Sequence, residues 1–148
     1  VVTATPSSHY PHRAPWQARV ETVQAQGVAA IAPGAVARWL TPGFAATTEG
    51  AALAKKLHDT RVAPAPAGSV AACQGVAAID FRESNGRIGG PTLVIAGARD
   101  EATPPAMSEA MVQAIPGAKL ASIDAAHLSA VERPQDFVQL LGNFYRSL

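Results

Sequence analysis

The sequence has few of the features that assign a chain to a specialised class. It contains a single cysteine, Cys73, which excludes an intrachain disulfide framework and a cysteine-rich zinc site. Its 12 basic residues nearly balance its 11 acidic residues, and no run of five or more like charges is present, so we expect no nucleic-acid partner. No apolar run approaches the roughly 18–20 residues that a membrane span needs. We therefore expect a globular chain of the cytoplasm with no membrane partner.

The first residues also lack features that usually open a protein. The sequence begins Val1-Val2-Thr3-Ala4, without a methionine, a basic segment or a cleavage signal. This β-prone apolar run ends at Pro6, so we predict a sheet strand over residues 1–6. Such a strand is typical of the interior of a sheet, and we expect further sheet strands before residue 1.

Residues 7–87 have the pattern of helices and loops, and we expect them to form a helical cap over a sheet. Apolar residues recur three or four positions apart, and prolines and glycines separate the periodic stretches. The predicted helices are Pro15 to about Ala32, a short one containing Val36, Trp39 and Leu40, Ala51–Leu57, and Ser69–Phe81.

Residues 88–148 have a different pattern. Thr92–Gly97 and Lys119–Asp124 are predicted strands, and each is followed by a loop and then by an amphipathic helix. This alternation is typical of a parallel α/β sheet with helices on its faces. We expect the last helix to bury its apolar residues, Phe137, Leu140, Leu141, Phe144 and Tyr145.

The loops after these two strands contain the strongest candidates for chemistry. Asp100 follows the first strand and His127 follows the second. In open α/β sheets functional residues gather where strands end, and a carboxylate there can fix the tautomer of a histidine. Taken alone, Asp100 is better explained as a turn residue, and His127 is better explained as an ordinary loop histidine. Together they favour an acid–histidine pair.

Four stretches carry a resemblance to a known family. GPTLVIAGARDEATPP (residues 90–105) and DAAHLSAVERPQDF (residues 124–137) resemble the C-terminal part of the α/β-hydrolase fold. RWLTPGF (residues 38–44) and GSVAACQGVAAIDFR (residues 68–82) are similar to cap segments of 3-oxoadipate enol-lactonases. The resemblance implies that Asp100 is the acid and His127 the base of a catalytic triad.

One element of that family is not found in this sequence. The Gly-x-Ser-x-Gly elbow that carries the nucleophile occurs nowhere among the 148 residues. We therefore interpret the chain as the C-terminal half of an α/β hydrolase, with the nucleophile and the oxyanion hole outside it. We expect the isolated chain to be inactive and to need a complementing N-terminal half or a second copy as partner.

Other residues are candidates for binding or for metal ligation. Trp39 is a candidate wall of the substrate pocket, and Arg38 a candidate partner of a substrate carboxylate. It is equally open that Trp39 packs the cap and Arg38 lies in solvent. His9 and His12 are unsuited to share a metal because Pro11 lies between them, and Cys73 is expected to be an inert buried thiol.

The resemblance implies hydrolysis of an ester or lactone bond without a cofactor or a metal, with 3-oxoadipate enol-lactone as substrate in aromatic catabolism. Another α/β-hydrolase chemistry remains open, either a carboxylesterase or a dehalogenase with an aspartate nucleophile. A non-catalytic chain also remains open, as a truncated or split product that needs a partner half or as a binding module.

Overall fold

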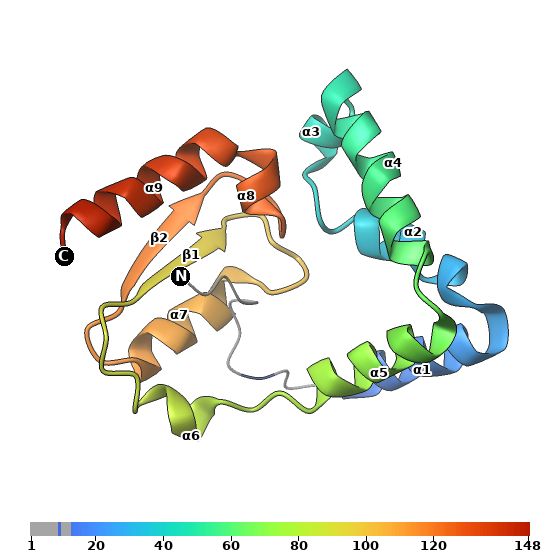
Figure 1. The fold of residues 1–148 in the computed structure, drawn as a ribbon, viewed down its shortest axis with the longest axis horizontal. Coiled ribbons are helices and arrows are strands. Elements are labelled where there is room, and N and C mark those ends of the chain that lie inside the picture. The colour runs from blue at the N-terminus through green and yellow to red at the C-terminus, as the bar shows by residue number, and fades with distance from the viewer. Residues whose placement is uncertain (1–8, 10–12) are drawn as a thin grey trace. The chain divides into compact units, whose positions relative to one another are not determined.

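The computed structural model describes His9 and residues 13–148 of the chain (Figure 1). The strand predicted for residues 1–6 lies outside the described residues, as does His12. The described residues form two compact units. An α/β unit contains residues 38–41 and 81–148, and a helical unit contains His9 and residues 13–37 and 42–80. Each unit is described separately.

The α/β unit is built on two parallel strands, as the sequence predicts. Strand β1 is Leu93–Gly97 and strand β2 is Lys119–Ile123. Their register places Leu93 opposite Lys119 and Gly97 opposite Ile123, so both strands end at the same edge (Figure 1). The helices of this unit are α6 (Arg82–Asn85), α7 (Pro105–Ala114), α8 (Ser129–Glu132) and α9 (Pro134–Arg146).

Helix α7 connects the two strands and packs mainly on β1, whereas α9 lies next to β2 (Figure 1). Both helices begin at a proline, whose missing N–H costs nothing in the first turn of a helix. Gly117 then turns the chain from α7 into β2 with a φ of 72°, a conformation that glycine adopts without strain. This arrangement is the strand–helix–strand unit of a parallel sheet.

The closing helix is less buried than the sequence predicts. Phe137, Leu140, Leu141 and Phe144 are only half-buried, and Tyr145 is 51% exposed. Helix α9 contacts β2 and α8, and β2 itself leaves Leu120 43% exposed in the described part of the chain. The amphipathic pattern therefore identified the helix and its apolar face, but the described residues cover that face only partly.

The helical unit contains α1 (Ala14–Gln26), the 3₁₀ turn η1 (Val28–Ala30), α2 (Ala32–Val36), α3 (Pro42–Ala45), α4 (Thr48–Val62) and α5 (Pro66–Ala77). The single helix predicted from Pro15 to Ala32 is wrong in extent, because Gly27 interrupts it with a φ of 82°. Trp39 and Leu40 follow α2 rather than lying in a helix. Pro42 is one of the prolines expected to separate the periodic stretches, but it instead begins α3.

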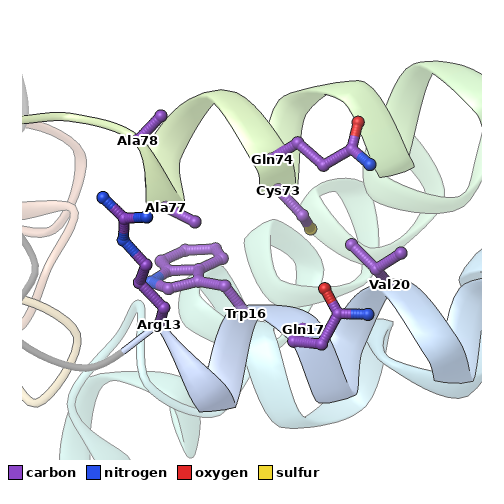
Figure 2. A pocket seen from close by; sticks show the side chains of 8 residues that line it. All are labelled: Arg13, Trp16, Gln17, Val20, Cys73, Gln74, Ala77 and Ala78. Carbon is purple, nitrogen blue, oxygen red and sulfur yellow. The ribbon is translucent and has the colours of Figure 1, made fainter.

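Helices α1 and α5 pack side by side and enclose a shallow hollow of about 190 Å³ (Figure 2). Trp16 from α1 lies in it beneath Ala77 of α5, and the guanidinium of Arg19 is 4.4 Å from the Trp16 ring. Cys73 points from α5 toward α1 and is 3% exposed, which confirms that it is a buried thiol. No acid–base pair lines this hollow, so it is not the candidate active site.

The described residues contain neither a candidate membrane span nor a candidate metal cluster. None of their helices is long and apolar enough to cross a lipid bilayer. Among the same residues, no three His, Cys, Asp or Glu side chains come together in a way that could hold a metal ion.

Candidate active site

The loops that follow β1 and β2 run together because their backbones are hydrogen-bonded. Ala98 donates its N–H to the carbonyl of Ile123 at 2.8 Å, and Arg99 donates to the carbonyl of Ala125 at 3.0 Å. The parallel pairing of the strands thus continues for one step beyond their ends. It brings the loop containing Asp100 against the loop containing His127.

Gly97 is required for this close approach. A Cβ atom at Gly97 would lie 2.2 Å from the carbonyl oxygen of Ala126 and 2.7 Å from that of Ala125. Both distances are far below van der Waals contact, and both atoms belong to the backbone. Only glycine therefore lets the histidine loop cross the end of β1 at this distance.

Asp100 is held by the turn that follows it. Its Oδ1 accepts hydrogen bonds from the backbone N–H groups of Ala102 (2.7 Å) and Thr103 (2.8 Å). Its Oδ2 accepts the hydroxyl of Thr103 at 2.7 Å. Asp100 is 4% exposed and Thr103 is 1% exposed, so both oxygens of a buried carboxylate have partners. Thr103 was missed from the sequence, although Asp followed three residues later by Thr is a typical turn signal.

The structure places Asp100 and His127 in direct contact, 27 residues apart in sequence. Nδ1 of His127 lies 2.8 Å from Oδ2 of Asp100 and 3.3 Å from Oγ1 of Thr103. A carboxylate can only accept, so Nδ1 is the donor and Nε2 is the basic nitrogen of the neutral ring. Nε2 has no hydrogen-bond partner among the described residues, and the His127 side chain is 21% exposed. The ring is therefore oriented with a basic nitrogen left for a reacting group.

The environment of Asp100 keeps its carboxyl group ionised. Burial raises the pKa of Asp100, but hydrogen bonds from His127 and Thr103 favour the charged form and outweigh burial. The net result is a pKa below the ordinary aspartate value. An ionised Asp100 both accepts the Nδ1 proton and stabilises an imidazolium when His127 takes up a second proton.

An ion pair joins the outer parts of the two loops. Nε and Nη2 of Arg99 each donate to an oxygen of Asp124 at 2.6 Å. The hydrogen bonds that Arg99 donates to Asp124 raise the pKa of Arg99 above its ordinary value. Because both side chains are more than half exposed, solvent and salt screen this bidentate pair and it contributes little to stability.

The segment containing the proposed substrate-binding residues lies beside the histidine loop. Leu128, the residue after His127, donates its N–H to the carbonyl of Trp39 at 3.0 Å. Arg38 and Trp39 are both partly buried. Nε of Arg38 is buried and has no hydrogen-bond partner in the part of the chain that the structure describes. A buried guanidinium N–H without a partner is costly unless another group binds it.

Glu132 is a second buried carboxylate near His127, and it was missed from the sequence. It is 4% exposed, lies at the end of α8, and accepts a hydrogen bond from the N–H of Ala126 at 3.1 Å. It also accepts from the N–H (3.1 Å) and from the hydroxyl of Thr41. A glutamate just before the Arg133-Pro134 helix start looks like a solvated residue in sequence, so no local signal marked it.

The arrangement can perform general acid–base chemistry but is incomplete for nucleophilic catalysis. His127 can take and return a proton through Nε2, with Asp100 fixing its tautomer. Among the described residues, no serine or cysteine is hydrogen-bonded to His127. The geometry thus contains an oriented base and its orienting acid, and it does not contain an activated nucleophile.

Comparison with known proteins agrees with this geometry. Residues 56–134 match the family described as the alpha/beta hydrolase fold. A 3-oxoadipate enol-lactonase 2 of Acinetobacter baylyi is 34% identical over 93% of this chain and 51% of its own length. The chain therefore spans about half the length of this relative.

Solved structures give the same result. The enol-lactonase of Burkholderia xenovorans superposes with a TM-score of 0.88 at 27% identity, over 95% of this chain and 53% of that one. A thermophilic esterase of Thermogutta terrifontis superposes with a TM-score of 0.81 at 26% identity, over 96% and 53% of the two chains. The strand ends, the paired loops and the match over more than half of the residues lead to one assignment. The chain belongs to the α/β-hydrolase fold family.

Proposed function

We propose that this chain supplies the acid and the base of a serine-type hydrolase that cleaves an ester or lactone bond. The observation that carries the proposal is the 2.8 Å hydrogen bond between Nδ1 of His127 and Oδ2 of Asp100. This bond leaves Nε2 of His127 basic and partly exposed, which is what a general base next to a nucleophile requires.

In the proposed reaction, Nε2 of His127 takes the proton of a serine hydroxyl as its oxygen bonds to the carbonyl carbon. Asp100 remains ionised and stabilises the imidazolium. His127 then returns the proton to the leaving oxygen as the ring ester bond breaks, which leaves an acyl-enzyme. A water molecule repeats the sequence at the acyl carbon, releases the carboxylic acid and restores the serine hydroxyl.

We propose that the nucleophile lies in a part of the hydrolase fold that these 148 residues do not include. Two observations support this: the sequence has no Gly-x-Ser-x-Gly motif, and the chain matches about half the length of its relative. The 148 residues alone are then inactive, and activity requires the complementing part of the fold.

For the substrate we propose 3-oxoadipate enol-lactone, formed during catabolism of aromatic compounds in the cytoplasm. The lactonase relative supports this choice, and so does Arg38. The substrate carries a carboxylate, and the buried, unpartnered Nε of Arg38 is suited to bind one. Trp39 then forms an apolar wall beside the carboxylate site.

The test uses the natural gene product, treated with a fluorophosphonate probe and assayed with the enol-lactone. We expect one labelled serine within a Gly-x-Ser-x-Gly motif, and loss of lactone hydrolysis in proportion to labelling. The isolated 148 residues serve as the matched control and should neither react nor hydrolyse. Labelling of a serine within the 148 residues, or robust hydrolysis by them alone, would overturn the assignment of the nucleophile.

A carboxylesterase is the second candidate, favoured by the similarity to the Thermogutta terrifontis esterase. The two functions separate by substrate preference. For a lactonase, we expect kcat/KM for the carboxylate-bearing lactone to exceed kcat/KM for a neutral short-chain ester by about 100-fold or more. A well-formed charge-assisted hydrogen bond has an effect of this size. The opposite preference would establish the esterase.

A further inference from the structure

We propose that Glu132 is a positioning residue: it fixes the backbone of the His127 loop and couples that loop to the segment containing Arg38 and Trp39. The proposal rests on the proposed function, because it assigns a role in the same site. It concerns a buried carboxylate that the proton transfers described above do not use.

The contacts of Glu132 support this role directly. Oε2 accepts the N–H groups of both Ala126 and Thr41, each at 3.1 Å, and Oε1 accepts the Thr41 hydroxyl. Glu132 and Thr41 are 4% and 5% exposed. Buried hydrogen bonds of this kind hold a fixed geometry, because water is not available to replace a lost partner.

These contacts fasten the chain on both sides of His127. The residue before it, Ala126, is held by Glu132, and the residue after it, Leu128, is held by the carbonyl of Trp39 at 3.0 Å. With both neighbouring N–H groups fixed, the backbone at His127 has little freedom to rotate the ring away from Asp100. A shift of about 1 Å in a reacting group can cost about 100-fold in rate.

Through Thr41, the Glu132 carboxylate also contacts the segment of residues 38–41. Thr41 lies three residues after Arg38 and donates two hydrogen bonds to Glu132. Glu132 therefore joins the proposed substrate-binding segment to the proposed base through one side chain. The position of Arg38 relative to His127 depends on this connection.

The three donors to Glu132 are uncharged, so the role requires a hydrogen-bond acceptor rather than a negative charge. Glutamine at this position can keep all three contacts: its Oε1 accepts both N–H groups, and its amide donates to the Thr41 oxygen. Alanine keeps none. If Glu132 acts by positioning the loop, Glu132→Gln should therefore keep its function and Glu132→Ala should lose it.

The kinetic test uses the natural gene product, with kcat expressed per serine titrated by the fluorophosphonate. Glu132→Ala should lower kcat by about 10- to 100-fold, and Glu132→Gln should stay within about threefold of the unmodified protein. Glu109→Ala, on the exposed surface of α7, is the matched control and should change neither kcat nor KM. An unchanged kcat in Glu132→Ala, or a Glu132→Gln variant as impaired as Glu132→Ala, would overturn the proposal.

Thr41→Val tests the coupling separately. It removes the hydroxyl bond to Glu132 but leaves the bonds from the backbone N–H groups of Thr41 and Ala126 intact. We expect KM for the carboxylate-bearing lactone to rise by about tenfold, with kcat within about threefold. A fall in kcat with KM unchanged would contradict the coupling. If Glu132→Ala does not fold, Glu132→Asp replaces it, because its shorter side chain cannot reach both Ala126 and Thr41.

A spectroscopic readout separates failure of this proposal from failure of the proposed function. The Nδ1 proton of His127, bonded to Asp100, should give a far-downfield NMR resonance that does not depend on turnover. It should persist in Glu132→Gln and weaken or vanish in Glu132→Ala. An unchanged resonance in Glu132→Ala would overturn the positioning role. Absence of hydrolysis with the predicted NMR changes would overturn only the proposed function.

Discussion

Thr103 donates its hydroxyl to the same oxygen of Asp100, Oδ2, that accepts the Nδ1 proton of His127. The two donors approach each other within 3.3 Å, so the carboxylate oxygen is held from two directions in a buried site. Thr103 thus supports the orientation of Asp100 and lies beside Nδ1 of His127, on the ring nitrogen that is bonded to Asp100 rather than on Nε2.

Replacing Thr103 with valine should destabilise the protein and weaken the site. Valine has nearly the same shape, but it leaves the buried Oδ2 with one hydrogen bond fewer. We expect a loss of about 1–3 kcal/mol in the free energy of unfolding and about a tenfold loss in kcat. Urea denaturation and single-turnover kinetics measure the two effects.

The matched control for this variant is Thr22→Val. The hydroxyl of Thr22 donates only to a carbonyl of its own helix, that of Ala18 in α1. Its loss should change the free energy of unfolding by less than about 0.5 kcal/mol. Equal effects of the two substitutions would show that the Thr103 hydroxyl has no special role at Asp100.

Gly97→Ala should displace the histidine loop. The new methyl group would lie 2.2 Å from the carbonyl oxygen of Ala126, so one of two backbone segments must move. We expect a loss of about 1–3 kcal/mol in the free energy of unfolding and a fall in kcat. Gly75→Ala in α5 is the control, because its added methyl group meets no atom within 4 Å, and it should be neutral or stabilising. A Gly97→Ala variant that behaves like the Gly75→Ala variant contradicts the close-approach argument.

The pKa of Asp100 predicts how stability depends on pH. Its folded pKa lies below the ordinary value of 3.8, so the unfolded state binds the proton more tightly. The ionised carboxylate therefore stabilises the fold at pH values above 3.8, and this contribution is lost as the pH falls through the folded pKa. Urea denaturation between about pH 6 and pH 3 should show a steeper loss for the unmodified protein than for Asp100→Asn. If the free energy of unfolding falls equally with pH in both proteins, Asp100 does not have this lowered pKa.

The sequence predicted the two strands and the closing helix because each depends on a local pattern. It predicted the pairing of Asp100 with His127 because both residues follow strands of one parallel sheet. A continuous apolar run bounded by glycines indicates a buried strand, and parallel strands end at the same edge. The two loops follow strands that end at this edge, so the contact between Asp100 and His127 could be predicted although 27 positions separate them.

The parts that were missed depend on tertiary contacts. Glu132 and Thr41 are 91 residues apart, and neither has a sequence pattern that distinguishes it from a surface residue. The break at Gly27 was missed because a glycine can lie within a helix or interrupt it. The start of α3 at Pro42 was missed because a proline can end one helix or begin the next. The limited burial of α9 was also unpredictable, since periodicity identifies an apolar face without specifying what covers it.

Arg38→Met tests the proposed carboxylate site. It should raise KM for the carboxylate-bearing lactone by about 10- to 100-fold, because methionine cannot form the charge-assisted bond that Nε offers. Hydrolysis of a neutral ester should remain within about threefold. Arg87→Met, an exposed position in the same unit, is the control. Equal losses on charged and neutral substrates would show that Arg38 does not bind the carboxylate.

His127, oriented by Asp100, is proposed to be the base that activates the nucleophile. The most direct measurement is kcat/KM for enol-lactone hydrolysis by the natural gene product and by its His127→Ala variant, with equal folded protein confirmed by circular dichroism. We predict a loss of about 1,000-fold or more, since a nucleophile without its base retains only the contribution of binding and oxyanion stabilisation. Lactone hydrolysis by His127→Ala within about tenfold of the unmodified rate would contradict the claim.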